Sequence, residues 1–153
     1  MLNALYPFVL AFHNFWRWIA LAAVLAALIL SLPGWFARKP WTLSNERVAR
    51  AAVGIMDVQL LLGLILYLGL SPLSRTLWLH FDAAMQSRDT RFFGLEHPFL
   101  MILATAAVHA GKLRSSRAAA DGPKHRAIVL WFGGSLILML LGTPWWRPLL
   151  RGL

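Results

Sequence analysis

The stretch RFFGLEHPFLMILATAAVHAGK, residues 91–112, is apolar over most of its length, yet it contains Glu96, His97 and His109. About 20 apolar residues are what an α-helix needs to cross a bilayer. Ionisable groups inside such a span are expensive, and they are usually retained for a function. The stretch therefore predicts a transmembrane helix and, within it, a functional site.

The composition of the whole chain indicates the same environment. Of its 153 residues, 59% are hydrophobic and 14% are charged, and the mean hydropathy is +0.62. A soluble domain of this length needs more polar surface, so we expect an integral membrane protein. The net charge of +9 lies mainly between the apolar runs, which favours contact with membrane lipids and argues against nucleic acid as a partner.

Cysteine is absent from the sequence. This excludes disulfides, thiolate metal sites, iron–sulfur clusters and covalently attached c-type haem. The sequence also lacks a P-loop, a helical HExxH motif and a nucleophile elbow, so hydrolytic and phosphoryl-transfer chemistry have no support. Whether the protein is an enzyme stays open.

Four apolar runs are long enough to be transmembrane helices, at about residues 6–32, 44–70, 92–113 and 124–142. They predict an all-α membrane protein with one domain, residues 1–153, built as an antiparallel, up-down four-helix bundle. The first helix should end at Pro33-Gly34, and Ser44, Asn45 and Glu46 should cap the second.

The segment between the second and third helices, residues 72–91, mixes large apolar residues with charges. This pattern predicts one short helix lying at the membrane interface. The segments that join the first helix to the second and the third to the fourth carry an excess of Lys and Arg. By the positive-inside rule these segments should stay cytoplasmic, which puts both termini and the 72–91 segment outside.

Two histidines lie at similar depths in the predicted bundle. His13 is seven residues past Tyr6, and His97 is five residues past Phe92 on a helix that runs in the same direction. At about 1.5 Å per residue, the two imidazoles should lie within roughly one turn of each other near the outer face. Such a pair can clamp the iron of a haem b as axial ligands. The alternative is that each histidine bonds lipid headgroups or a neighbouring carbonyl.

His109 should not share that site. It lies 12 residues beyond His97, so it points roughly 120° away and about 18 Å deeper. A second haem at that depth has weak support, because the residue available on the second helix is Asp57. The alternative is a hydrogen bond from His109 to Asp57 or to a backbone carbonyl.

Three further residues are candidates near the first site. Arg17 follows His13 by four residues and shares its helix face; it should either pair with Asp57 or neutralise a haem propionate. Glu96 is a candidate proton acceptor from a quinol, and a solvated carboxylate is the alternative. Met101, one turn after His97, is a candidate haem contact or axial ligand, with simple packing as the alternative.

Five segments spread over nearly the whole chain carry a resemblance: FHNFWRW, VQLLLGLILYLGLSP, RFFGLEHPFLMILA, GKLRSSRAAADGPKHRAI and TPWW. They resemble small four-helix bacterial membrane proteins, frequent in Bacteroidota, that are usually labelled cytochrome b-like. The resemblance implies a haem b electron carrier of the bacterial inner membrane that works with quinones or a respiratory partner. The positions shared with that pattern are His13, Arg17, Gln59, Glu96 and His97. Asp57 stands where members commonly have a histidine.

Two function classes follow. In the first, the protein is a haem b electron-transfer module that exchanges electrons with quinone or with a redox partner. In the second, it is a cofactor-free accessory subunit of a larger membrane complex, or it assembles with copies of itself. Copper handling through His and Met is a weaker third alternative, because the Met residues do not cluster in the sequence.

Overall fold

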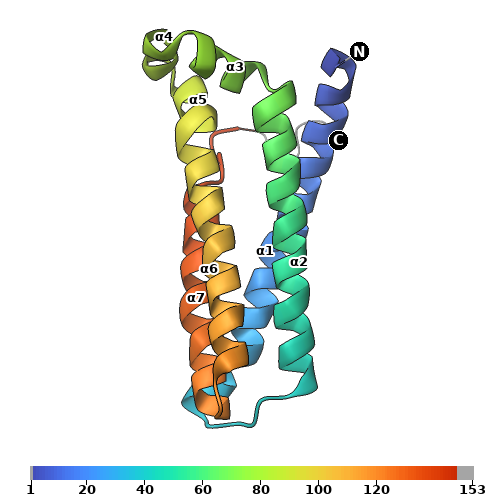
Figure 1. Cartoon of the computed structure of the whole chain (residues 1–153), viewed down its shortest axis with the longest axis vertical. Helices are drawn as coiled ribbons and strands as arrows, with labels where there is room; N and C mark the ends of the chain where they lie inside the picture. The colour runs from blue at the N-terminus through green and yellow to red at the C-terminus, as the bar shows by residue number, and fades with distance from the viewer. Residues whose placement is uncertain (1, 148–153) are drawn as a thin grey trace.

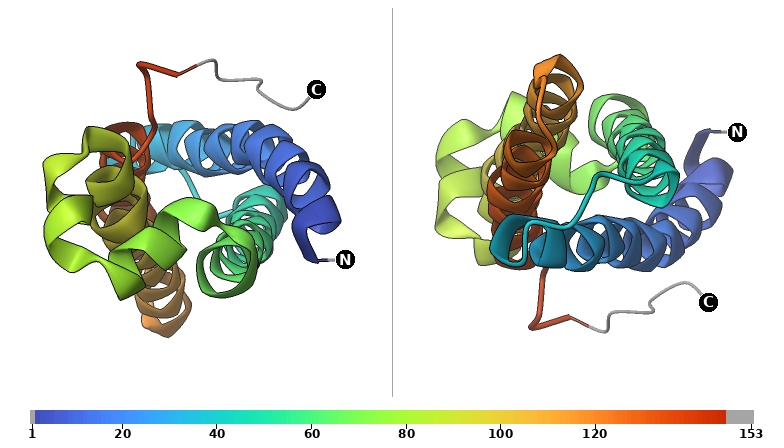
Figure 2. Two further views of the ribbon diagram at one scale, coloured as in Figure 1. Left: turned by 90° about the horizontal axis from the view of Figure 1, so that it is seen from above. Right: turned by 90° about the horizontal axis from the view of Figure 1, so that it is seen from below.

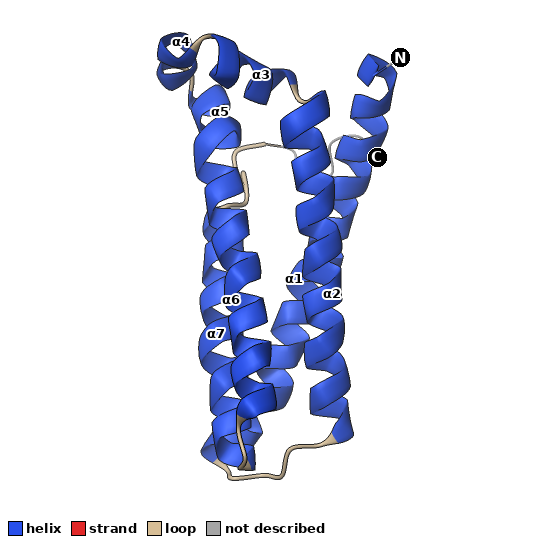
Figure 3. Ribbon diagram, in the orientation of Figure 1, coloured by secondary structure: helices blue, strands red, loops and turns tan. Residues whose placement is uncertain are grey.

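Four long helices make up most of the structure, a computed structural model that describes residues 2–147. They are α1 (Leu2–Phe36), α2 (Leu43–Ile65), α6 (His97–Arg117) and α7 (Asp121–Leu141), and every regular element in the described part is helical (Figure 3). Four helical stretches there are long and apolar enough to cross a membrane, with mean hydropathies between 1.3 and 2.2. These stretches are Ala4–Phe36, Leu43–Leu70, Arg88–Arg117 and Asp121–Leu141. The all-helical class and the four long apolar helices are thus as the sequence predicted.

The helices lie side by side along the long axis of the molecule (Figure 1). The connection between α1 and α2 and the one between α6 and α7 lie at one end, and the short helices between α2 and α6 cover part of the other. Seen end-on, α7 packs against both α6 and α1, and α1 packs against α2 (Figure 2). The contact between α2 and α6 is the least extensive of these neighbouring pairs.

The first helix does not end at Pro33-Gly34, so that sequence prediction is wrong. Helix α1 continues to Phe36, and the amide of Ala37 still donates to the carbonyl of Pro33 at 2.8 Å. A proline in the last turn removes a single helical hydrogen bond, which a long helix tolerates. Gly34 is buried beneath the ring of His125, and a Cβ at this position would overlap that ring.

The cap of the second helix begins two residues before Ser44, and Asn45, one of the predicted capping residues, takes part in it. Thr42 is the N-cap: the amide of Asn45 donates to the Thr42 hydroxyl at 3.3 Å, and the amide of Thr42 donates to the Asn45 side chain at 3.1 Å. This reciprocal pair is a capping box. Asn45 also donates from Nδ2 to the carbonyl of Leu30 at 2.9 Å, which ties the start of α2 to α1.

Two π-helical segments lie at the same end of the bundle, η1 (Leu66–Leu70) after α2 and η2 (Phe92–Glu96) before α6. Pro98 has no N–H, so it cannot donate to the carbonyl of Gly94 as an α-helical residue would. The hydroxyl of Tyr67, in η1, donates to that carbonyl at 2.8 Å instead. The missing helical bond of α6 is thus replaced by a bond that joins the two π segments.

The segment between α2 and α6 forms three short helices, not the one that was predicted. They are α3 (Pro72–Leu79), α4 (Phe81–Gln86) and α5 (Arg88–Arg91). The breaks fall at His80 and Ser87, whose backbone dihedrals are non-helical. Each such residue starts a new helix because its carbonyl can still accept the first bond of the next turn.

The core between the four helices is rich in alanine. Its fully buried members are Ala20, Leu21, Val24, Ala27, Ala49, Ala52, Met56, Ala104, Val108, Ile128, Phe132 and Met139. Small side chains let helix backbones approach closely, which is how helices associate in lipid. Long apolar side chains meanwhile point outward from all four helices.

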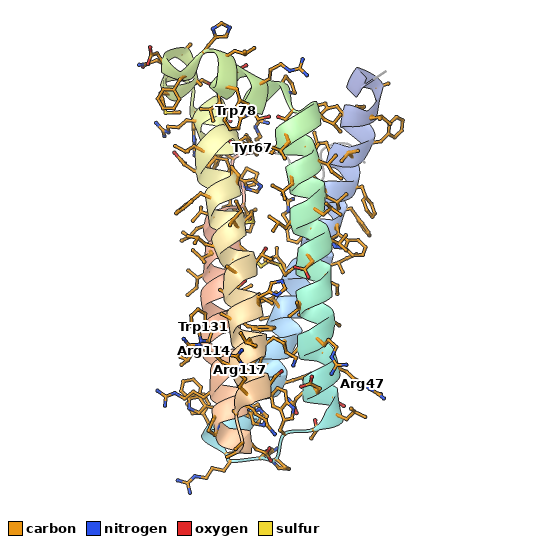
Figure 4. The ribbon with its side chains drawn as sticks, in the orientation of Figure 1. Arg47, Tyr67, Trp78, Arg114, Arg117 and Trp131 are labelled. Carbon is orange, nitrogen blue, oxygen red and sulfur yellow. The ribbon has the colours of Figure 1, made fainter. Side chains whose placement is uncertain are left out.

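Most of the basic residues lie at the end with the two direct connections. Figure 4 shows Arg47, Arg114 and Arg117 there, and Tyr67 and Trp78 near the opposite end. The guanidinium of Arg114 lies 4.7 Å from the ring centroid of Trp131. The two ends of the bundle therefore differ in charge, as the loops of a membrane protein with a fixed orientation would.

Candidate functional site

His97 is the first residue of α6, directly after the π segment η2. Its Nδ1 lies 2.7 Å from the carbonyl oxygen of Gly142, just past the end of α7. Because a carbonyl only accepts, Nδ1 must carry the proton, and Nε2 is left as the ring atom with a lone pair. A histidine held in this way has the tautomer and orientation of a metal ligand.

His13 lies in the N-terminal half of α1 and is buried, with 8% of its surface exposed. Its Nε2 lies 3.3 Å from the side-chain amide nitrogen of Gln59 on α2. Its Nδ1 is buried and has no hydrogen-bond partner in the described part of the chain. The Gln59 amide nitrogen only donates, so His13 Nε2 accepts and Nδ1 carries the proton of the neutral ring. Turning the Gln59 amide by 180° would let its Oε1, which has no partner among the described residues, accept from Nε2–H and leave the lone pair on Nδ1.

The two imidazoles are neighbours. Their ring centroids are 6.2 Å apart and their planes are inclined at 78°. The closeness predicted from their depths on two separate helices is therefore present. A metal held between two imidazoles, about 2.0 Å from each nitrogen, places the ring centroids roughly 6 Å apart.

Both histidines line one large cavity between α1, α2, α6 and α7. Its volume is about 140 Å³, roughly ten times the space that one water molecule requires. The surface of its wall is mostly apolar. The polar side chains that line it beside the two histidines are Tyr6, Asn14, Arg17, Gln59, Tyr67, Ser71, Thr105, Thr143 and Arg147. An apolar pocket with a few convergent polar groups is typical of a site for a cofactor or another organic molecule.

Arg17 and Met101 also line this cavity. Arg17 is buried, with 8% exposed, and its guanidinium lies 5.3 Å from the ring centroid of Trp18. A guanidinium suits a carboxylate on a bound group because its fork matches two oxygens. The methyl group of Met101 packs against Gly142, where a Cβ would overlap it. Met101 thus packs against Gly142 and also lines the cavity, and its contact with a haem stays a prediction.

Asp57 and His109 do not belong to this cavity. His109 Nε2 lies 2.7 Å from Asp57 Oδ1, and the side chains are 52% and 49% exposed. Of the partners considered for Asp57, the structure therefore selects His109, and the alternative pairing of Asp57 with Arg17 is wrong. The bond joins α2 and α6 at the surface, so these residues do not face the site of His13 and His97.

Glu96 points away from the neighbouring histidine. Its carboxylate accepts from Arg91 Nε at 2.8 Å, and both side chains are more than two-fifths exposed. This is a surface ion pair, the solvated alternative for Glu96.

The sequence did not indicate several contacts that shape the site. Nothing in the sequence indicates that the carbonyl of Gly142 is the partner of His97, because this contact depends on how α7 packs against α6. Gly63 lies on the α2 face next to His13, and a Cβ there would be 3.3 Å from His13 Cε1. His125, to which the sequence assigned no role, is 1% exposed and lies 4.9 Å from the ring of Trp41.

Comparison of this chain with protein-family models, with curated proteins and with solved structures gives no match. The case for a function therefore depends on the site itself. Within residues 2–147, no group of three or more His, Cys, Asp or Glu side chains is arranged to hold a bare metal ion. A haem iron needs only two ligands from the protein, and the 6.2 Å spacing of the His13 and His97 rings fits that requirement.

Proposed function

We propose that this protein is a b-type haem electron-transfer protein of a bacterial inner membrane, exchanging electrons with quinone or with a redox partner complex. The observation that carries the proposal is the pair of imidazoles 6.2 Å apart on α1 and α6. Each has one nitrogen held by a polar group of the chain and one left over. The resemblance to cytochrome b-like membrane proteins supports the same cofactor.

Different residues of the cavity would contact different parts of a haem b. His13 and His97 would hold the iron, and the Gly142 carbonyl and the Gln59 amide hold their rings. Arg17 neutralises a propionate from within the same cavity. The aliphatic wall excludes water, which keeps the site in a low dielectric and influences its reduction potential. When bound, haem b supplies one-electron redox chemistry.

The membrane location forms part of the proposal. Four helical stretches have the length and hydropathy of transmembrane helices, and we propose that they cross the bilayer in alternating directions. The basic end with Arg47, Arg114 and Arg117 (Figure 4) faces the cytoplasm. Both termini and the α3–α5 segment are then periplasmic. The site of His13 and His97 lies nearer the periplasmic face.

The test is a reduced-minus-oxidised visible spectrum of the full chain purified in detergent, with haem quantified per polypeptide. We expect a low-spin b-type spectrum at one haem per chain. His97→Ala should abolish it, whereas His80→Ala, which changes an exposed histidine, should leave it intact. His109→Ala should also retain most of the haem, because His109 lies outside the cavity. An unchanged spectrum in His97→Ala would reject the ligand assignment.

A second candidate function is a cofactor-free accessory subunit of a membrane complex. It is favoured by Asp57, which stands where members of the resembled family commonly have a histidine and which makes a surface pair in this chain. Folded protein without haem, after expression with ample haem supply, would support this candidate and contradict the first. His13 and His97 would then be packing residues.

A further inference from the structure

An ionisable pair lies half-exposed midway along two membrane-length helices. Asp57 is 57 − 43 = 14 residues from the start of the stretch Leu43–Leu70 and 70 − 57 = 13 from its end. At about 1.5 Å per residue, either end is roughly 20 Å away. His109 is at the same depth because it bonds Asp57 at 2.7 Å. In a bilayer, this pair would face the centre of the hydrocarbon.

Lipid is a poor environment for such a pair. Ionisable side chains near the centre of a transmembrane helix are costly and almost always face protein or a water-filled cavity. About half of each side chain is nonetheless exposed on the single chain. Protein outside this chain is therefore expected to cover the pair.

The surface around the pair suits close contact with another helix. On α2 it is formed by Gly54, Val58 and Leu61, all exposed, and a Cβ added to Gly54 would meet nothing within 4 Å. On α6 it is continued by the exposed Ala106 and Leu113. Small residues next to a polar group allow backbones to approach and the polar groups to bond across the interface.

The pair is complementary to itself. His109 uses Nε2 and Asp57 uses Oδ1 in their mutual bond, and neither His109 Nδ1 nor Asp57 Oδ2 makes a further hydrogen bond to the described residues. When the pair is an ion pair, with the imidazole of His109 protonated, Nδ1–H remains as a donor and Asp57 Oδ2 as an acceptor. Rotation about a twofold axis along the membrane normal leaves the depth of every residue unchanged, and it reverses the order of α2 and α6 across the face. It therefore brings α2 of one copy opposite α6 of the other, so that His109 of each copy lies opposite Asp57 of its partner and the charges of the two pairs are complementary.

We propose that the face of α2 and α6 centred on Asp57 and His109 is the interface through which two copies of this chain form a twofold-symmetric dimer in the membrane. The proposal rests on the proposed membrane location and is independent of haem. The dimer covers the ionisable pair and satisfies both remaining polar atoms. It also covers the least extensive helix contact of the bundle, the one between α2 and α6.

The geometry can be tested by cross-linking, since the chain has no native cysteine. Because α2 and α6 run in opposite directions, Gly54 of one copy should lie near the depth of Leu113 of the other. Full-length Gly54→Cys and Leu113→Cys chains, mixed and reconstituted together in phosphatidylcholine nanodiscs or vesicles, should form a mixed disulfide dimer on mild oxidation. The matched control mixes Ile29→Cys with Leu130→Cys, which lie on exposed faces of α1 and α7. Each is five residues from the contact of Gly34 with His125, so the two positions have similar depth, and they should not cross-link.

A second measurement does not depend on cysteine. The wild-type chain should have the mass of a dimer in nanodiscs large enough to hold two copies, and Asp57→Leu combined with His109→Leu should weaken dimerisation at least tenfold. This variant removes charges from a lipid-facing surface, so helicity measured by circular dichroism should be retained. A monomeric wild-type chain, or a cross-link in the control mixture alone, would overturn the proposal. Haem content, measured on the same samples, reports on the proposed function separately.

Discussion

At the residue scale, the site depends on which ring nitrogens of His13 and His97 make a hydrogen bond to the chain and which do not. His97 is oriented by the backbone carbonyl of Gly142 at 2.7 Å, and a substitution at position 142 does not remove that carbonyl. His13 depends on Gln59, a side chain 46 positions away on another helix. A mutation of Gln59 can therefore disturb the orientation of His13, whereas the partner of His97 is a backbone group. Gln59 is thus the position at which the role of these hydrogen bonds can be tested.

Gln59→Leu should weaken haem binding by about 10- to 100-fold while one haem still binds at saturation, because groups that orient a ligand tune affinity without providing the metal bond. Haem titration of the apoprotein, followed by the visible spectrum, measures the effect. Gln86→Leu, at an exposed position of α4, is the matched control and should bind as the wild type does. Equal affinity of the two variants would show that Gln59 does not act on His13.

The contact of Gly34 with His125 gives a prediction that does not involve any cofactor. Gly34→Ala should destabilise the fold by about 1–3 kcal/mol, because the new methyl group would overlap a ring that is buried between α1, α7 and Trp41. Thermal unfolding in detergent measures the change. Gly134→Ala in α7 is the control: a Cβ there meets nothing within 4 Å, so stability should be unchanged or raised by about 0.5–1 kcal/mol. If the two variants unfold alike, the packing of His125 on Gly34 is not tight.

At the scale of elements, the π segments position the site. Segment η2 ends at Glu96, and His97 follows as the first α-helical residue. Widened turns of this kind occur often at functional sites. In this chain the cause is visible, since Pro98 cannot donate to Gly94 and Tyr67 donates in its place. The orientation of His97 is thus coupled to the end of α2.

Tyr67→Phe should destabilise the protein by about 1–3 kcal/mol, because it leaves the Gly94 carbonyl without its donor. In a Pro98→Ala background the same change should cost much less, since the new backbone N–H can take over the bond. The free energies of unfolding of the four chains form a double-mutant cycle. Strictly additive effects would mean that Tyr67 and Pro98 are not linked through Gly94.

At the scale of the whole molecule, the asymmetry between the two ends is the main feature. Arg47, Arg114 and Arg117 lie at the end of the direct connections, whereas the three short helices cover part of the opposite end (Figures 1 and 4). Loop charges of this kind fix the orientation of a multi-pass protein during insertion. In the proposed membrane location, they would also set which face of the membrane lies nearer the histidine pair.

The orientation can be measured with single cysteines. Ser87→Cys lies between α4 and α5, and Ser116→Cys lies at the end of α6 next to the α6–α7 connection; both positions are exposed. In intact cells, a membrane-impermeant maleimide should label the chain with Cys at position 87 and not the one with Cys at position 116. Labelling of both after lysis is the control for reactivity. The reverse pattern in intact cells would contradict the proposed orientation, and equal labelling would contradict a membrane-spanning chain.

Much of the fold was predictable because it depends on local composition. Four apolar runs gave four long helices, and the basic residues were expected between them. The prediction that His13 and His97 meet was correct because depth along a helix follows from counting residues. Helix boundaries were less predictable: Pro33 did not end α1, because a single lost hydrogen bond near a helix end is tolerated.

The sequence by itself determined the helical class, the four long apolar segments and the equal depth of the two histidines, since each follows from periodicity and length. Only the tertiary structure decided the partners of the polar atoms. It paired Asp57 with His109, Glu96 with Arg91 and His97 with the Gly142 carbonyl. The physical reason is that a side chain's depth is fixed by its own helix, whereas its neighbours depend on how the helices rotate and pack against one another.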